Sequence, residues 1–134
     1  MILALDANIV SYILKEDSDI VSRYREEIAR GNTFIMPPVA FYEVQRGLLA
    51  RRLLRKLKIF EDFCQDVDVG VFDAQMWLKA AQIYATLNQK GKPVGGDGDI
   101  LIAAFCIVND YTLVTNNTKH FEHIDGLKLE NWKQ

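Results

Sequence analysis

The stretch VGGDGDILIAAFCIVNDYTLVTNN (residues 94–117) carries the pattern that decides the fold. It places Asp97 and Asp99 among three glycines, and the sequence then runs apolar without a break from 100 to 108. That run is far too short to cross a membrane, and its length suits a buried helix. The tetrapeptide TLVT (112–115) follows, so the stretch predicts a buried helix that leads into a buried strand.

The remainder of the chain repeats this alternation of helix and strand. Strands are predicted at 1–5 (MILAL), 33–36 (TFIM), 67–72 (VDVGVF), 112–115 and, as a last edge strand, within 127–132 (LKLENW). Helices are predicted at 8–15, 19–30, 38–50, 51–64, 74–89 and 99–109. Asp73 is expected to cap the fifth of these helices. We expect the inner side of that helix to carry Ala80, Ala81, Ile83, Tyr84 and Leu87. The alternation predicts one α/β domain, residues 1–134, with a mostly parallel sheet between two helical layers (α/β/α).

Composition sets the class of protein. With 134 residues, of which 49% are apolar and 25% charged, the chain has the balance of an ordinary globular domain. A net charge of -2 argues against nucleic-acid binding by bulk charge and leaves room for a local basic patch. Cys64 and Cys106 lie in apolar sequence without metal-ligand spacing, so we expect buried free thiols. No basic leader precedes the first strand, and we expect a soluble, cytoplasmic protein.

Polar residues far apart in the chain are predicted to meet at one edge of the sheet. Asp6 ends the first strand. Asp97 and Asp99 open the helix that leads into TLVT, and Asn116 and Asn117 directly follow that strand. In a parallel α/β sheet, the starts of the helices share an edge with the ends of the strands, and ligands gather there. These side chains are therefore expected to converge.

Glu43 is the fourth acid of this predicted cluster. It lies one to two turns into the helix that begins at Pro38, about 8 Å below the edge at ~1.5 Å per residue. Its neighbours on that helical face are Val39 and Gly47, which are apolar or small. The alternative is an ordinary helical ion pair with Arg46, three residues further on.

The cluster as a whole points to a cation. Each acid taken singly could cap a helix, and negative charge at a helix N-terminus is favourable. Three or four carboxylates at one place repel one another unless a cation lies between them. All the donors are oxygens, which favours Mg²⁺, with Mn²⁺ as a second choice. His120 and His123 could bind zinc, although a solvated turn is the more ordinary interpretation.

Five segments together resemble one known family. They are LDANIVSYIL (5–14), YEVQRG (42–47), DGDILIAAFC (97–106), TLVTNNTKHF (112–121) and GLKLENW (126–132). In this order and spacing they are similar to the PIN-domain toxins of the VapC type. The resemblance implies a PIN-like fold and a Mg²⁺-dependent endoribonuclease that cleaves RNA phosphodiester bonds. It also implies a homodimer that is silenced by a small cognate antitoxin.

The resemblance also implies roles for individual residues. Asp6, Glu43 and Asp99 match the acids that hold metal and carry catalysis, and Asn117 matches a fourth catalytic position. Asp97 has no fixed counterpart and is expected to be an auxiliary metal acid that reaches the site from the loop. Asn8 matches the family and is expected to contact the substrate. Ala7 departs from it, because Thr or Ser is common there, and the lost hydroxyl could slow the reaction.

The segment RRLLRKLK suggests where RNA would bind. We expect Arg51, Arg55 and Lys58 along one face of the helix 51–64, as a rim that contacts phosphates. The opposite face would carry Leu54, Leu57 and Phe60. Lys15, Lys90 and Lys92 are further candidates for the rim. The alternatives are a solvated amphipathic helix and a groove for the antitoxin.

Three other functions remain open at this point. A phosphatase with Asp6 as nucleophile would need a second aspartate at position 8, where Asn8 stands. A non-catalytic module could hold a metal or a basic peptide in the same acidic pocket. A PIN-domain nuclease could also process RNA without any antitoxin.

Overall fold

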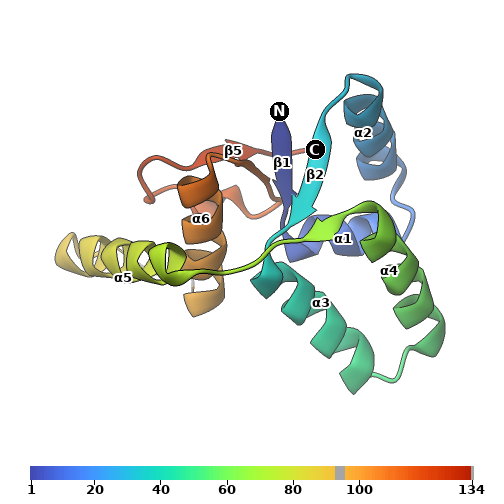
Figure 1. The fold of residues 1–134 in the computed structure, drawn as a ribbon, viewed down its shortest axis with the longest axis horizontal. Helices are drawn as coiled ribbons and strands as arrows, with labels where there is room; N and C mark the ends of the chain where they lie inside the picture. Colours follow the sequence, from blue (N-terminus) through green and yellow to red (C-terminus); the bar gives the residue numbers. More distant parts are fainter. Residues whose placement is uncertain (93–95, 134) are drawn as a thin grey trace.

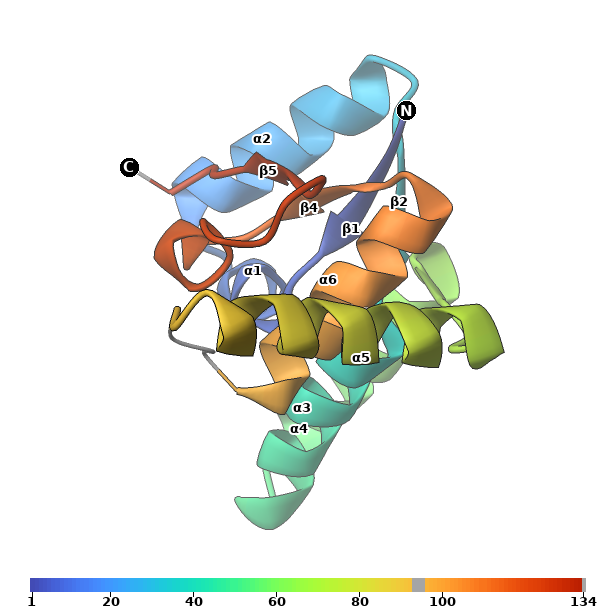
Figure 2. The same cartoon turned by 90° about the vertical axis from the view of Figure 1, so that its left-hand side faces the viewer.

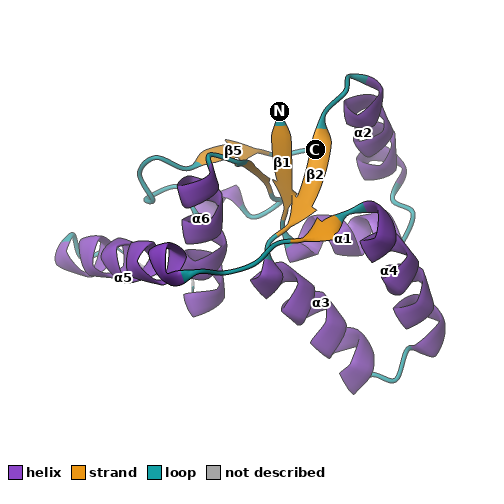
Figure 3. Cartoon of the chain, in the orientation of Figure 1, coloured by secondary structure: helices purple, strands orange, loops and turns teal. Residues whose placement is uncertain are grey.

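The described residues form a five-stranded sheet in which every strand is parallel to its neighbours (Figure 3). The computed structural model describes residues 1–92 and 96–133. The strands are β1 (Ile2–Leu5), β2 (Thr33–Met36), β3 (Asp68–Val69), β4 (Thr112–Val114) and β5 (Lys128–Glu130), in the order β3-β2-β1-β4-β5. The predicted parallel sheet is confirmed, and the segment 127–132 does supply an edge strand.

Helices cover both faces of this sheet (Figures 1 and 2). They are α1 (Ala7–Leu14), α2 (Ser18–Ala29), α3 (Pro38–Ala50), α4 (Leu54–Asp66), α5 (Ala74–Gln89) and α6 (Asp97–Asn109), with a 3-10 turn η1 (Thr118–His120). α1 to α4 connect β1, β2 and β3 in turn, whereas α5 and α6 lead back across the sheet from β3 to β4. Because such crossovers are right-handed, α5 and α6 cover the face opposite α1 and α2. The α/β/α prediction is confirmed.

The core explains why α6 is apolar on all sides. Leu3, Ala4 and Leu5 of β1 are fully buried, and so are Leu113 and Val114 of β4. The middle of α6, residues 102–106, is also buried, because it packs between the sheet and α5. The helix begins at Asp97, two residues earlier than predicted, after Gly96 with φ 133°. Of the preceding loop, residues 93–95 lie outside the described part of the chain.

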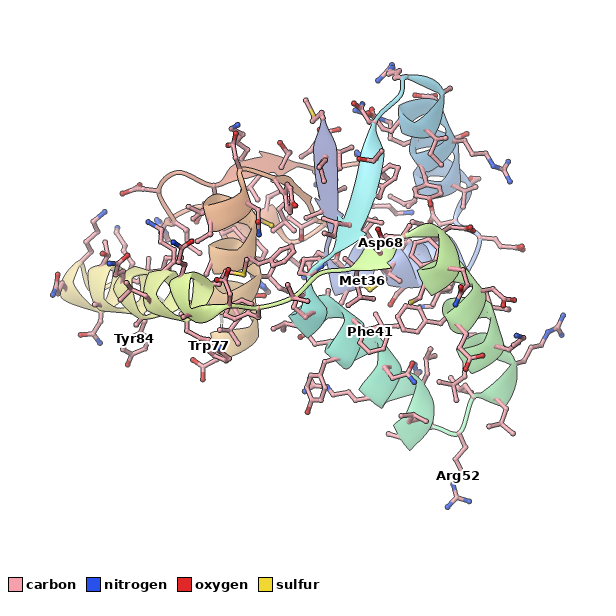
Figure 4. All side chains as sticks on the ribbon, in the orientation of Figure 1. Met36, Phe41, Arg52, Asp68, Trp77 and Tyr84 are labelled. Carbon is pink, nitrogen blue, oxygen red and sulfur yellow. The ribbon has the colours of Figure 1, made fainter. Side chains whose placement is uncertain are left out.

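The prediction of one helix over 51–64 was wrong at its start. Arg51 ends α3, and Arg52 has the left-handed φ of 53°, so the chain turns before α4 begins at Leu54. α3 and α4 therefore form a helical hairpin, with Arg52 at its tip (Figure 4). Leu54 is 75% exposed and does not belong to an inner face.

The prediction of a strand over 67–72 was also too long. Pairing with β2 stops after Val69, and Gly70 passes directly over the ring of Phe105. A Cβ at Gly70 would stand 2.4 Å from Phe105 Cζ, so only glycine fits this approach.

The capping of α5 was predicted correctly, but its inner side only in part. Asp73 caps α5 by accepting a hydrogen bond from Met76 N. Buried on this helix are Met76, Ala80, Ile83 and Leu87. Tyr84 and Ala81, which we expected on the inner side, are exposed instead.

Two expectations from composition can be compared with the structure. Both cysteines are free thiols; Cys106 is buried as expected, and Cys64 is only partly buried. Within residues 1–92 and 96–133, no helix has the length and apolar character needed to cross a membrane.

Candidate functional site

Asp6 is the most constrained acid of the predicted cluster. It follows β1, is 5% exposed, and caps α1 by accepting a hydrogen bond from Ala7 N at 2.8 Å. Its other carboxylate oxygen accepts from Thr115 Oγ1 at 2.8 Å and from Asn8 Nδ2 at 3.3 Å. Burial raises the pKa of Asp6, although these hydrogen bonds oppose the rise. Asp6 is therefore both a helix cap and a member of the site.

Thr115 holds Asp6 in place and was missed in the sequence. Its side chain is fully buried, and its hydroxyl oxygen also accepts a hydrogen bond from Asn117 N at 3.0 Å. A signal was present, because β1 and β4 are adjacent and Leu5 pairs with Val114. The next residue of each strand must then be adjacent, and these are Asp6 and Thr115.

Asn8 links α1 to the loop after β4. Its Oδ1 accepts from Asn116 N at 3.1 Å, and its Nδ2 donates to Asp6 and to Thr115 Oγ1, the latter at 3.4 Å. Both ends of this amide are thus bonded to the protein itself. Asn117, by contrast, is exposed, and in the described part of the chain its side-chain amide has no protein partner.

Asp99 lies in the first turn of α6 and meets a histidine that the sequence did not reveal. Its Oδ2 is 3.2 Å from His120 Nδ1, which comes from η1. Burial raises the pKa of Asp99, and His120 lowers it in part. His123 contacts a different acid, with its Nε2 3.4 Å from Oε1 of Glu122. His120 does lie in an exposed 3-10 turn, as the solvated-turn interpretation expected, and it also contacts Asp99.

Glu43 reaches from α3 toward the start of α6. Its Oε2 would lie 3.4 Å from a Cβ at Gly98. The alternative ion pair with Arg46 does not form: among the described residues, Glu43 has no cation within 4.0 Å, and Arg46 lies over the ring of Tyr42 at 4.9 Å. Burial raises the pKa of Glu43, the charges of Asp6 and Asp99 raise it further, and Arg46 opposes them.

The electrostatics of Asp6, Glu43 and Asp99 couple these three acids, while Asp97 stands apart. The charge of Asp99 also raises the pKa of Asp6, so the three carboxylates repel one another. Asp97 is exposed, opens α6, and lines a surface groove with Trp77 and Tyr84 of α5. The prediction that Asp97 would reach the site from a loop was wrong about its place, because it is helical.

The donor chemistry fits a hard divalent cation. In the described residues, no three acid, histidine or cysteine side chains stand close enough to hold an ion as they are arranged. The three carboxylates come from three elements; burial raises the pKa of each, and charge repulsion from the neighbouring acids adds to the rise at Asp6 and Glu43. A cation between them would remove that repulsion, and an all-oxygen donor set suits Mg²⁺ or Mn²⁺.

The structure separates the predicted basic residues into two groups. Arg51 and Lys15 line a pocket that Glu43 also lines, and Lys56, which the sequence analysis missed, lines it too. Lys58 instead lies 3.3 Å from Asp62, and Lys90 lies 3.2 Å from Asp125. Arg55 and Lys92 are exposed and do not line this pocket.

Comparison with known proteins gives a consistent picture. Residues 3–127 match the PIN domain family. The chain is 34% identical to Ribonuclease VapC2 of Rickettsia felis, over 98% of each chain, and 31% identical to the tRNA(fMet)-specific endonuclease VapC of Shigella flexneri, over 96% of each. A solved structure of VapBC2 from Rickettsia felis, bound to a DNA fragment from its promoter, superposes with a TM-score of 0.91 at 30% identity, over 99% of this chain and 100% of that one. DNA-bound VapBC from Salmonella typhimurium gives 0.85 at 29% identity, over 99% of each chain.

Proposed function

This chain belongs to the PIN-domain family, among the proteins of the VapC type, and from that membership we propose that it is a metal-dependent endoribonuclease and the toxin of a toxin–antitoxin pair. The observation that carries the proposal is the meeting of Asp6, Glu43 and Asp99, three carboxylates whose pKa values burial raises and whose charged forms a bound cation would stabilise. The names of the relatives, ribonuclease and endonuclease, support RNA as the substrate.

Each residue of the site has a proposed part in the reaction. Asp6 and Asp99 would hold the divalent ion, Mg²⁺ or Mn²⁺. When bound, such an ion supplies Lewis-acid activation of water and offsets charge on the phosphate. Glu43, whose pKa burial raises, is suited to take the proton from the attacking water. Asn117, whose side-chain amide bonds no other described residue, would donate a hydrogen bond to the scissile phosphate.

The supporting residues act through these groups. Thr115 and Asn8 fix the carboxylate of Asp6, so Asn8 would affect the substrate mainly through Asp6 and the loop after β4. His120 would hold the carboxylate of Asp99. Asp97, exposed on the side of α5, would act as an outer acid.

The test is cleavage of RNA with Mg²⁺ and with a chelator. We expect wild-type chain to cleave only with Mg²⁺, and Asp99→Asn to lose at least about a hundredfold in rate, because one acid of the coupled site is gone. Asp97→Asn is the matched control from the same helical turn, and we expect it to lose less than tenfold. Cleavage by Asp99→Asn at the wild-type rate would remove Asp99 from the mechanism.

We further propose a cognate antitoxin and a homodimer. The solved relatives named VapBC support an antitoxin partner. The exposed apolar side chains of the α3–α4 hairpin, Tyr42, Leu49, Leu54 and Ile59, offer it a docking surface. Trp77 and Tyr84, which project from the same side of α5, would lie between two copies of the chain (Figure 4). A Trp77→Glu/Tyr84→Glu chain should then be monomeric by light scattering while the wild type is dimeric; a wild-type monomer would refute the homodimer.

A further inference from the structure

A second pocket lies directly beside the acids, between α1, α3 and the first turn of α4. It has a volume of about 110 Å³, and Glu43 forms part of its wall. Three cations line it. Lys15 follows the end of α1, Arg51 follows the end of α3, and Lys56 lies in the first turn of α4. We call this site the basic pocket.

The three cations have no acidic partner. Within residues 1–92 and 96–133, none of them has a carboxylate oxygen within 4.0 Å, whereas Lys58, two residues beyond Lys56, is paired. Arg51 donates one long hydrogen bond, from Nε to the carbonyl oxygen of Gly47 at 3.4 Å. Three like charges around one cavity repel one another, and an anion bound in the cavity would be attracted to all three.

The shape and chemistry of the pocket suit a phosphate group. Its volume far exceeds the roughly 10–15 Å³ that one water molecule needs. A guanidinium presents a planar fork that matches phosphate oxygens, and the lysine ammonium groups add point charges. Apolar side chains such as Leu14 and Leu48 complete the wall, and the three cations outnumber Glu43, the one carboxylate of the lining.

We propose that the basic pocket binds the phosphate of the RNA strand that neighbours the scissile phosphate. This inference rests on the proposed function, since it uses the same strand. Glu43 borders both places, so a strand with one phosphate at the acids has its neighbour at the basic pocket. The substrate then crosses the side of α1, α3 and α4, and the α5 side stays outside its path.

Binding of RNA in the presence of EDTA tests the proposal without cleavage. The probe is a fluorescein-labelled, unstructured oligoribonucleotide, titrated with the full chain at several salt concentrations. We expect Lys56→Gln and Arg51→Gln each to weaken binding about tenfold and to reduce the slope of log K against log [salt] by about 0.7, the value for one single-strand phosphate contact. Arg52→Gln, at the tip of the same hairpin, and Lys79→Gln, on α5, are the controls for loss of one positive charge, with an expected change below twofold.

Gly47→Leu tests the cavity without changing any charge. A Cβ at Gly47 meets no atom within 4 Å, so the larger side chain enters the open pocket. Leucine also favours a helix more than glycine does, so the fold should not weaken. We expect this variant to lose at least about fivefold in RNA binding.

The outcomes separate the two proposals. Pocket variants that bind RNA like the wild type, or that lose no more than the two controls, would overturn the basic pocket even if the wild type cleaves RNA. A wild type that never cleaves RNA with Mg²⁺ would refute the proposed function, while the binding result still decides the pocket. Pocket variants with normal RNA binding but lost inhibition by the cognate antitoxin would assign the pocket to that protein instead.

Discussion

Replacing Thr115 with valine removes one hydroxyl from the centre of the site and changes little else in shape. The hydroxyl donates to Asp6 at 2.8 Å, and both side chains are buried. A hydrogen bond to a charged group contributes roughly 1.5–3 kcal/mol to stability, and loss of the donor leaves the carboxylate poorly satisfied. We therefore expect Thr115→Val to lower the free energy of unfolding by about 2–3 kcal/mol.

Thermal unfolding followed by circular dichroism in EDTA measures this loss. At about 2.1 cal/mol/K per residue, 134 residues give an unfolding entropy near 0.28 kcal/mol/K, so Tm should fall by about 7–11 °C. Because the hydrogen bond from Thr115 lowers the pKa of Asp6, the same variant should raise that pKa in an NMR titration. RNA cleavage should fall as well, since Asp6 loses its fixed orientation.

Two further variants test whether the Thr115 hydroxyl is the cause of these effects. Thr115→Ser keeps the hydroxyl and should leave the pKa of Asp6 and most of the cleavage rate as in the wild type. Thr33→Val changes the same residue type at an exposed position of β2 and should leave Tm within about 2 °C. If Thr115→Val melts like Thr33→Val, or if Thr115→Ser behaves like Thr115→Val, the hydroxyl does not hold Asp6.

Three other predictions concern packing, metal and pH. Gly70→Ala should destabilise the fold by about 1–3 kcal/mol in chemical denaturation, because the added methyl group meets the ring of Phe105 at 2.4 Å; an unchanged midpoint would contradict that contact. Mg²⁺ at a hundred times its Kd should raise the free energy of unfolding of the wild type by about 2.7 kcal/mol. Asp99→Asn should be more stable than the wild type in EDTA, and Mg²⁺ should stabilise it little. If Mg²⁺ stabilises both proteins equally, the ion binds elsewhere. Burial raises the pKa of Glu27, but hydrogen bonds from Arg23 and Asn32 outweigh burial, so the pKa is lowered. Ionised Glu27 therefore stabilises the fold above the pKa that it has in the unfolded chain, and this stabilisation is lost as the pH falls through the pKa that it has in the folded protein. Glu27→Gln should remove that part of the pH dependence of Tm; a wild-type profile in the variant would exclude Glu27 as its source.

Periodicity and strand ends were enough to predict the sheet and its acidic edge. The apolar run of α6 and the strand after it identify a parallel α/β unit, and Asp6 and Asp99 follow from the rule that strand ends and helix starts share an edge. Glu43 was predicted to the correct side because α3 begins at Pro38 as expected.

The missed features depend on local turns that periodicity does not record. Arg52 adopts a left-handed φ without being glycine or asparagine, so nothing in RRLLRKLK marked the break between α3 and α4. Counting the helix from residue 51 grouped Lys58 with Arg51 and left unnoticed Lys56, which lines the pocket with Arg51. His120 reaches Asp99 only because η1 folds the chain back after β4, and a short turn of this kind has no periodic pattern.

The double duty of Asp6 has a consequence for mutagenesis. An Asp6→Ala chain would lose the acceptor for Ala7 N and leave Thr115 and Asn8 without their shared partner. Loss of activity in this variant would therefore combine the fraying of α1 with damage to the site. Asparagine at the same position keeps the Oδ1 acceptor for Ala7 N and removes the charge, and it places an amide donor where Thr115 and Asn8 now donate. Scanning this protein with alanine would therefore overstate what Asp6 contributes to chemistry, and the isosteric amide is the informative replacement.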